Sequence, residues 1–255
     1  MNAIHLTPSL EERSFRLFVS YAGGDFHGFQ QQVNGPRTVE GELIAAAHKL
    51  DQGEFDLRGA SRTDAGVHAL RQCVLLRLTT RLDAQTLAKA LQALTPLDIA
   101  IVSCEEVAEE FNPQFDSTEK RYVYRYSTAK RRPVFGLQWQ WHVWHDLDVK
   151  AMHEAAQLFV GRHDFEGMRN RSDAETDDTI RTMRAAAVIK ESDDSMFFEI
   201  IGEGFLYKMV RNMAGCLYYV GQGRMKVADI QQMLSTKNCE LGGPSAPAHG
   251  LFLAD

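Results

Sequence analysis

The spacing of hydrophobic residues over the first 110 positions predicts a complete α+β unit. Strands are expected where apolar residues alternate with polar ones or dominate a short run, and helices where they recur every three or four positions. Thr38 and Asp83 stand where helix N-caps are expected. The predicted strands cover 14–21, 55–58, 67–79 and 98–107, and the predicted helices cover 38–50 and 83–94. The order βαββαβ is typical of the ferredoxin-like split unit.

The rest of the chain shows a similar order of hydrophobic patterns. A hairpin is expected across "ESDD", and a last short strand is expected at the end of the sequence. The predicted strands cover 121–127, 182–190, 195–201 and 249–255, and the predicted helices cover 148–161, 205–221 and 227–237. Two copies of one topology predict two α+β domains that join near residues 108–118.

Composition and missing motifs narrow the class of protein. The four cysteines lie far apart without a CxxC pair, which argues against a zinc site or a disulfide framework and suits a reducing cytoplasm. No signal-peptide pattern opens the chain, and no apolar run approaches the ~18 residues of a membrane span. Neither His27 nor His68 has a second ligand at metal spacing, and no dinucleotide, P-loop or serine-hydrolase motif occurs. We therefore expect no metal, no cofactor and no membrane contact.

One acidic residue stands within a run of small ones, "RGASRTDAGVHAL" (58–70). Small residues let the backbone turn sharply and approach another group closely. Asp64, two positions after Arg62, is therefore either a turn-forming residue or a working carboxylate. Composition alone favours the turn, because an Asp side chain readily bonds nearby backbone amides.

The net charge of −6 means that a nucleic-acid partner would have to be held by a local cluster of cations. "EKRYVYRYSTAKRRP" (119–133) is such a cluster, with six basic residues against the single acid Glu119. Its three tyrosines share one face of a strand, where rings could stack on bases and cations could meet phosphates. The alternative is an edge strand whose charges prevent aggregation. If the cluster binds RNA, we expect Lys120, Arg121, Lys130, Arg131, Arg132 and Lys208 in a cleft beside Asp64.

Two further segments contain candidate chemistry. Tyr207 and Arg211 are four positions apart in "GFLYKMVRNMAG" (204–215), so on a helix they would share one face, with Lys208 nearby. An ordinary amphipathic helix is the alternative. "GRHDFEGMRN" (161–170) places His163 beside Asp164, a pair that is more often structural than catalytic.

Taken together, these segments resemble the TruA family of tRNA pseudouridine synthases. The family signature G-A-G-R-T-D-A-G-V-H-A is matched by "GASRTDAGVHA", unbroken from Arg62 to His68. "KRYVY" resembles the motif of the family's active-site tyrosine, and "YKMVRNMAG" that of its active-site arginine. The segments "YAGGDFHGFQQQ", "TVEGEL" and "SAPAHGLFL" are similar to further family motifs, so the resemblance spans nearly the whole chain.

The resemblance implies a fold and an activity. The fold would be two ferredoxin-like domains, 1–110 and 111–255, that form one extended antiparallel sheet with helices on one side and a catalytic cleft between the domains. The activity would be the isomerisation of uridine to pseudouridine in tRNA, in the anticodon stem-loop at tRNA positions 38 to 40, without a cofactor. The protein would be a cytoplasmic homodimer that binds tRNA across both subunits.

The resemblance also implies roles for individual residues. Asp64 would be the catalytic nucleophile, and Arg211 would pair with it. Tyr122 would stack on the uracil and help to remove the C5 proton. Arg62 would help to hold the flipped nucleotide out of the RNA stack. The other residues expected to contact the substrate are Thr63, His68, Lys120, Arg121, Tyr207 and Lys208.

The chain departs from the family pattern at several probable RNA contacts. Phe29 stands where Trp is usual, Gln31 where a cation is common and Ser61 where glycine is usual. "EFNPQFDS" (110–117), which contains Gln114, lacks the family's His and Arg. Two other interpretations remain open: an RNA-binding paralogue without activity, and a synthase that acts on another uridine or another RNA. The intact run from Arg62 to Asp64 favours an enzyme.

Overall fold

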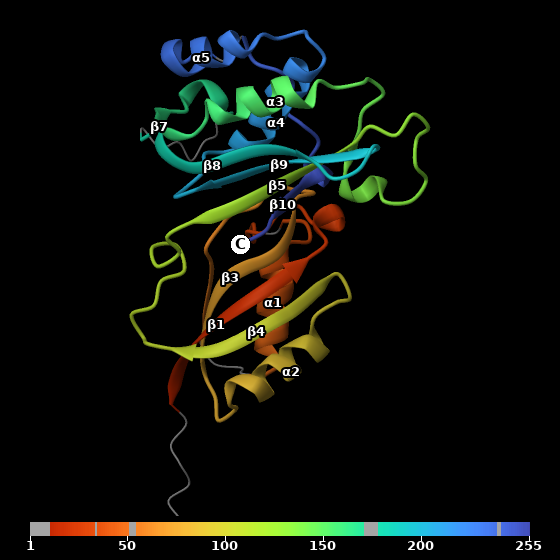
Figure 1. The fold of residues 1–255 in the computed structure, drawn as a ribbon. Coiled ribbons are helices and arrows are strands. Elements are labelled where there is room, and N and C mark those ends of the chain that lie inside the picture. Colours follow the sequence, from red (N-terminus) through yellow and green to blue (C-terminus); the bar gives the residue numbers. More distant parts are fainter. Residues whose placement is uncertain (1–10, 34, 51–54, 171–177, 239–240) are drawn as a thin grey trace, which may run out of the picture.

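A computed structural model describes residues 11–33, 35–50, 55–170, 178–238 and 241–255. Within these ranges the strands form a ten-stranded sheet, with helices from both halves of the chain packed against it (Figure 1). The elements of the first half are β1 (Glu12–Tyr21), α1 (Val39–His48), β2 (Asp56–Gly59), β3 (His68–Thr79), α2 (Ala84–Leu94) and β4 (Ile99–Val107). Thr38 and Asp83 cap α1 and α2 by accepting from Gly41 N and Thr86 N, as predicted.

The second half repeats this arrangement with three additions. Its elements are β5 (Lys120–Ser127), β6 (Trp141–His142), α3 (Val149–Gln157), β7 (Gly161–Asp164), β8 (Ile180–Lys190), β9 (Ser195–Gly202), α4 (Met209–Gly221), α5 (Val227–Thr236) and β10 (Leu251–Leu253). The first half gives the order β4-β1-β3-β2, and the second gives β10-β5-β9-β8. Both match a ferredoxin-like unit, so the predicted α+β class is confirmed. The short strands β6 and β7 and the helix α5 are additions to that unit.

The C-terminal strand β10 joins the two halves into one sheet. It pairs antiparallel with β5 through Leu251–Leu253, and parallel with β3 through Phe252↔His68 and Leu253↔Ala69. The sheet is antiparallel except at this seam and where β6 runs beside β5. The β2 strand pairs with β3 only at residues 74–77. In the described sheet, residues 70–73 of β3 therefore have neither β2 nor β10 beside them, and the seam is open there.

The two faces of the sheet differ in polarity. One face carries the apolar side chains of the strands and is covered by the helices, as when Tyr126 of β5 donates to Ala214 O of α4 (2.9 Å). Figure 1 shows α1 and α2 against the β1–β4 half, and α3 and α4 against the β8–β9 half. On the other face, ion pairs join neighbouring strands, such as Arg16–Glu105 (2.7 Å), and Arg125 of β5 pairs with Glu191 in the β8–β9 turn (2.5 Å). Among the described residues, no helix is both long and apolar enough to cross a bilayer.

Two helices are shorter than their hydrophobic patterns predict. The helix expected over 148–161 ends at Gln157, and Gly161 (φ 111°) begins β7 on the edge of β8. Phe159 is buried in the intervening turn, so the apolar period continues past the helix end. The helix expected over 205–221 begins only at Met209, after Lys208 in a left-handed conformation (φ 57°). Tyr207 therefore precedes α4 and does not share a helical face with Arg211.

The close packing at the seam leads to a prediction for Gly250, which directly precedes β10. A Cβ at this position would lie 2.7 Å from Cζ of Tyr124 and 3.1 Å from Arg125 O. The Tyr124 ring is buried and its hydroxyl donates to Pro247 O (2.9 Å), so it cannot retreat without losing that bond. We expect Gly250→Ala to lower the free energy of unfolding by ~1–3 kcal/mol, measured by urea denaturation.

Gly24→Ala is the matched control, because a Cβ at Gly24 would have no heavy atom within 4 Å. Its unfolding free energy should stay within ~0.5 kcal/mol of that of the wild type. Equal unfolding midpoints for the two variants would contradict the view that the seam is tightly packed at Gly250.

Candidate active site

A cavity of about 350 Å³ opens where the two halves meet. Ligand sites typically have volumes of ~300–1,000 Å³, so the cavity is large enough for a small organic group. Its walls come from the β2–β3 loop, the start of β5 and the segment that leads into α4. The polar side chains that line it are those of Ser61, Arg62, Thr63, Asp64, Gln114, Lys120, Tyr122, Tyr207, Lys208 and Arg211. The apolar lining includes Phe205, Leu206, Met209, Val210 and Leu251.

Asp64 lies in a loop whose backbone is held by hydrogen bonds from residues before and after the loop. Thr63 O accepts from Phe29 N (3.1 Å), and Asp64 O accepts from Val67 N (3.1 Å) to close a turn. Gly28 (φ 97°) runs so close that a Cβ there would lie 2.8 Å from Thr63 O. Gly28, which lies outside the signature, thus allows close backbone packing against this loop, and the Asp64 side chain is on the cavity wall rather than in a cap.

Arg211, from the first turns of α4, reaches across the seam to Asp64. Its Nη1 donates to Asp64 Oδ2 at 3.0 Å, and the two side chains are only 14% and 16% exposed. Its Nε donates to Ala246 O at 2.8 Å, and Arg211 O accepts from Ala246 N (3.0 Å). The guanidinium is therefore fixed on one side by the backbone before β10, and its other side is presented to the carboxylate.

Tyr122 forms an aromatic wall beside Asp64. Its ring is 8% exposed and meets Phe205 edge-on, with centroids 4.9 Å apart. The pKa of Tyr122 is raised to about 12: burial is the main cause, a hydrogen bond with Ser61 opposes the rise, and the nearby charge of Asp64 adds to it. The phenol is therefore protonated at neutral pH, and the side chain offers a flat apolar surface and a hydroxyl rather than a base.

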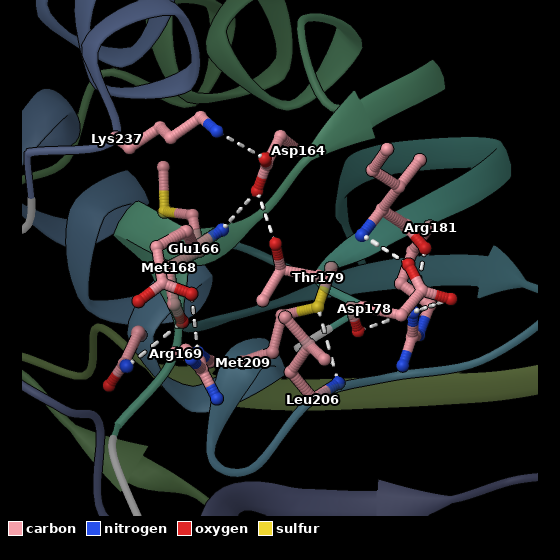
Figure 2. A network of polar contacts seen from close by, with 12 residues as sticks. Asp164, Glu166, Met168, Arg169, Asp178, Thr179, Arg181, Leu206, Met209 and Lys237 are labelled. Atoms are coloured by element: carbon pink, nitrogen blue, oxygen red, sulfur yellow. Dashed lines mark hydrogen bonds and ion pairs between the residues drawn. The ribbon is translucent and has the colours of Figure 1, made fainter. Parts of the chain in front are cut away.

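The segment 205–208 forms the wall opposite the Asp64 loop. It is held by Leu206 N, which donates to the sulfur of Met209 (3.5 Å), as Figure 2 shows. Tyr207 O accepts from Asn170 N (3.1 Å), and Asn212 of α4 donates to Asn170 Oδ1 (2.8 Å). These bonds leave the Tyr207 ring 44% exposed at the cavity mouth, with Lys208 Nζ 5.0 Å from its centroid.

Asp164 and His163 do not form a catalytic pair. Asp164 binds Lys237 Nζ (2.7 Å), the Thr179 hydroxyl (2.7 Å) and Glu166 N (3.0 Å), all visible in Figure 2. Burial alone would raise the pKa of Asp164, but these partners lower it to about 2. His163 Nε2 instead contacts Val160 O (2.9 Å). The network ties β7 to β8 and α5, which is the structural role that the sequence favoured.

The structure brings most of the predicted site residues to the cavity. Asp64, Tyr122, Arg211, Arg62, Tyr207 and Lys208 all line it. Lys120 also lines it, but its amine already donates to Ala60 O (2.8 Å). Thr63 is on the wall, where its hydroxyl bonds that of the buried Tyr21 (2.8 Å).

Two residues expected to contact the substrate lie away from the cavity. His68 is 2% exposed; its Nδ1 accepts from Gly23 N (2.9 Å), its Nε2 contacts His249 O (3.2 Å), and burial lowers its pKa. Arg121 extends from the opposite face of β5 and pairs there with Glu199. Strand alternation explains this placement, because a residue next to Tyr122 in β5 must face the other way.

The predicted basic cluster is therefore divided by the fold. Lys120 lies at the cavity and Arg121 on the far face, while Lys130, Arg131 and Arg132 are exposed beyond the other end of β5 and are not part of the cavity lining. Of the predicted patch, only Lys120 and Lys208 line the cavity beside Asp64. The prediction of one continuous patch in the cleft is wrong for the other four.

The positions that depart from the family pattern have distinct environments. Phe29 is buried, and a Cβ added at Gly59 would lie only 2.4 Å from the Phe29 ring. Ser61 is buried in the cavity wall, whereas Gln114 is an exposed part of it. Gln31 is exposed outside the cavity, and its backbone amide binds Glu40 (2.6 Å).

Several groups that shape the site were not predicted. Phe205 packs on Tyr122, the Ala246 carbonyl orients Arg211, and Tyr21 and Gln72 hold the Asp64 loop. "SAPAHGLFL" was recognised as a motif, but its sequence does not reveal that the group in contact with Arg211 is a backbone carbonyl, that of Ala246. In the sequence, Tyr21 and Gln72 occupy ordinary strand positions. Only the fold shows that they contact the Asp64 loop.

Comparisons with known proteins identify the family of the chain. The family model for tRNA pseudouridine synthases matches residues 17–116 and 155–255. The chain is 35% identical over 241 residues to tRNA pseudouridine synthase A of Thermoanaerobacter sp. (strain X514), which covers 94% of this chain and 98% of that relative. It is 36% identical over 244 residues to the protein of the same name from Limosilactobacillus fermentum (strain NBRC 3956 / LMG 18251), with 94% of each chain covered.

A third relative, tRNA pseudouridine synthase A of Myxococcus xanthus, is 36% identical over 240 residues, with 94% of this chain and 90% of the relative covered. Among solved structures, the crystal structure of a Cbf5-Nop10-Gar1 complex aligns at 14% identity with a TM-score of 0.32, covering 81% of this chain and 44% of that chain. This score is too low to support a comparison of folds. The sequence relationships are sufficient on their own: the chain belongs to the TruA family of tRNA pseudouridine synthases, which are isomerases.

Proposed function

We propose that this protein isomerises uridine to pseudouridine in tRNA, with Asp64 as the nucleophile. The observation that carries the proposal is the Asp64–Arg211 pair (3.0 Å) on the wall of a cavity that Tyr122 also lines. A carboxylate attacks only when it is ionised, and a fixed guanidinium stabilises that form and orients it. The names of the relatives support the same activity.

The proposed reaction conserves every atom of the substrate. An oxygen of Asp64 forms a bond to C1′ of the ribose or to C6 of the uracil, and the N1–C1′ bond breaks. The detached base turns within the cavity, C5 bonds to C1′, C5 loses its proton and N1 gains one. If Asp64 is bonded to C1′, that bond breaks as C5 bonds to C1′; if it is bonded to C6, that bond breaks afterwards. Either route restores the carboxylate. Because Arg211 engages Oδ2, we assign the attack to Oδ1.

In this proposal Tyr122 acts through its ring and not as a base. A phenol with a pKa of about 12 is almost wholly protonated at pH 7, so it is a poor acceptor for the C5 proton. The ring is well placed to stack on a uracil that enters the cavity, since Phe205 supports it edge-on. This revises the role in proton removal that the resemblance implied.

The RNA contacts that we propose surround the cavity mouth. Arg62 is exposed beside Asp64, where it can replace the flipped uridine in the RNA stack. Tyr207 and Lys208 on the opposite wall offer a ring and a cation to a neighbouring nucleotide. We assign the substrate to the anticodon stem-loop of tRNA, at positions 38 to 40, on the basis of the family resemblance. Pseudouridine mapping of total RNA from a deletion strain tests this assignment, and loss at another uridine or in another RNA would redirect it.

We also propose that the protein is a cytoplasmic homodimer that binds tRNA across both subunits. Val134, Phe135 and Trp144, in the connection between β5 and α3, are 82%, 90% and 68% exposed. Large apolar side chains left in water commonly mark an interface. Light scattering should give twice the mass of one chain, and Phe135→Glu combined with Trp144→Glu should halve it. A wild-type protein that is monomeric at micromolar concentration would contradict this proposal.

Asp64→Asn tests the activity itself. The substitution keeps the volume and the loop but removes the nucleophile, so we expect no detectable tritium release from tRNA labelled at uracil C5. Affinity for tRNA should stay close to that of the wild type. A rate within about tenfold of the wild type, a barrier change of only ~1.4 kcal/mol, would contradict the nucleophile assignment. If the wild-type protein bound tRNA but released no tritium, it would instead be an RNA-binding paralogue without activity.

Tyr122→Phe tests whether the phenol is a base. The variant keeps the ring, so we expect a rate within ~10-fold of the wild type, and a wild-type to variant ratio that is constant from pH 7 to 9. Tyr122→Leu, which removes the stacking surface, should lose far more activity. If the phenolate were the base, the wild-type rate would rise about tenfold per pH unit below its pKa of about 12, and the Phe variant would be inactive.

A further inference from the structure

Lys120 makes an unusual contact for a cation in an RNA-binding cleft. It is the first residue of β5, and its Nζ donates to Ala60 O at 2.8 Å, across the seam from the other half of the chain. Among the ion pairs of the described residues, Lys120 has no acidic partner. Lys120 is partly buried, and this burial lowers its pKa, so its ammonium is less hydrated than that of a surface lysine. Burying a charge is costly, so its position calls for a function.

The carbonyl that Lys120 binds belongs to the run that ends in Asp64. Ala60 N donates to Cys73 O (2.9 Å), which attaches the start of the run to β3. The next carbonyl, Ser61 O, accepts from Gln72 Nε2 (2.5 Å), and Gln72 is completely buried in β3. Two consecutive carbonyls are therefore held by side chains, one from each half of the protein.

The second half of the chain contacts this run at both of its ends. Lys120 binds the carbonyl of Ala60, four residues before Asp64, and Arg211 binds the carboxylate itself. A shift of Ala60 away from β5 would pull the loop away from α4 and lengthen the contact between Asp64 and Arg211. β3 holds the start of the run through Cys73 O and Gln72, but no described strand pairs with the run on the side that faces β5.

We propose that Lys120 is a positioning residue, which fixes the backbone of the Asp64 loop to β5 and so sets the geometry of attack. Its amine is committed to a carbonyl rather than to an RNA phosphate. Gln72 supports the same run from β3. The inference rests on the proposed function, and it replaces the substrate contact that the sequence suggested for Lys120. A long, flexible side chain suits this role because it spans the seam at a place where no described strand pairs with the loop.

Lys120→Met tests the proposal, because Met keeps much of the apolar stem and removes the donor. We expect the single-turnover rate on tRNA to fall by ~10–100-fold, as expected for a displacement of the reacting groups by about 1 Å. The KM and the dependence of tRNA affinity on salt should match the wild type. Lys120→Arg, which restores a donor of similar length, should recover part of the rate.

Lys208→Met is the matched control on the opposite wall of the cavity. If Lys208 contacts a phosphate, its loss should raise KM and reduce the log–log salt slope by ~0.7–0.9, with a smaller effect on the rate. The same pattern in Lys120→Met, a higher KM and a shallower slope at an unchanged rate, would overturn the proposal and make Lys120 a phosphate contact.

Amide hydrogen exchange supplies a readout that does not depend on activity. Exchange at residues 60–64 should be faster in Lys120→Met than in the wild type, while α2 stays unchanged. Unchanged exchange in this run would overturn the proposal. If the wild type were inactive on tRNA, the proposed function would fail, and this measurement would still decide whether Lys120 holds the loop.

Gln72→Met is a second variant in case Lys120→Met does not fold. It removes the donor to Ser61 O, together with Gln72 Oε1, a buried acceptor that has no hydrogen-bond partner among the described residues. It should likewise slow the single-turnover rate at unchanged KM and speed exchange at residues 60–64. A folded Gln72→Met variant with a normal rate and normal exchange would overturn the view that held carbonyls position Asp64.

Discussion

The ion pair between Asp64 and Arg211 is the interaction on which the working arrangement of this protein depends. Its partners are 147 positions apart and belong to different halves of the chain, so it exists only when the halves are correctly joined. Buried ion pairs add little net stability, because the desolvation cost offsets most of the attraction. The pair is better understood as a product of the fold than as its support. The stability comes from the sheet and from the apolar face that the helices cover.

The way the halves are joined explains why the site lies where it does. β10 continues the sheet from β5 to β3, but it pairs with β3 over only two residues. A fully paired seam would have made a continuous sheet with no opening. The short seam leaves room for the Asp64 loop to lie between β3 and β5, with side chains rather than a strand to hold it. The cavity is thus a consequence of incomplete pairing, and its geometry depends on individual contacts such as those of Lys120 and Gln72.

The sequence predicted the positions of the helices and strands better than it predicted the side of the sheet on which individual residues lie. Alternation and helical periodicity located nearly all of the long strands and helices, because each of them buries one face against a shared core. They missed β7 and the late start of α4, where buried Phe159 and Leu206 continue the apolar pattern through irregular backbone. Asp64, Tyr122 and Arg211 were identified by motif. The motifs did not predict the environments of Arg121 and His68, because a motif match gives no information about which face of the sheet a residue occupies.

The distribution of charge suggests how an acidic protein can bind a polyanion. Several arginines on the open face of the sheet are already paired: Arg16 with Glu105 and Arg121 with Glu199 across strands, and Arg125 with Glu191 of the β8–β9 turn. Such pairs cancel locally and contribute little to a long-range field. Within the described residues, Arg62 and Lys208 take part in no ion pair, and both lie at the cavity. In the proposed function, Arg62 and Lys208 attract the phosphate backbone to the cavity mouth beside Asp64. Lys130, Arg131 and Arg132 are exposed and likewise take part in no ion pair among the described residues, so attraction for RNA also acts beyond the end of β5.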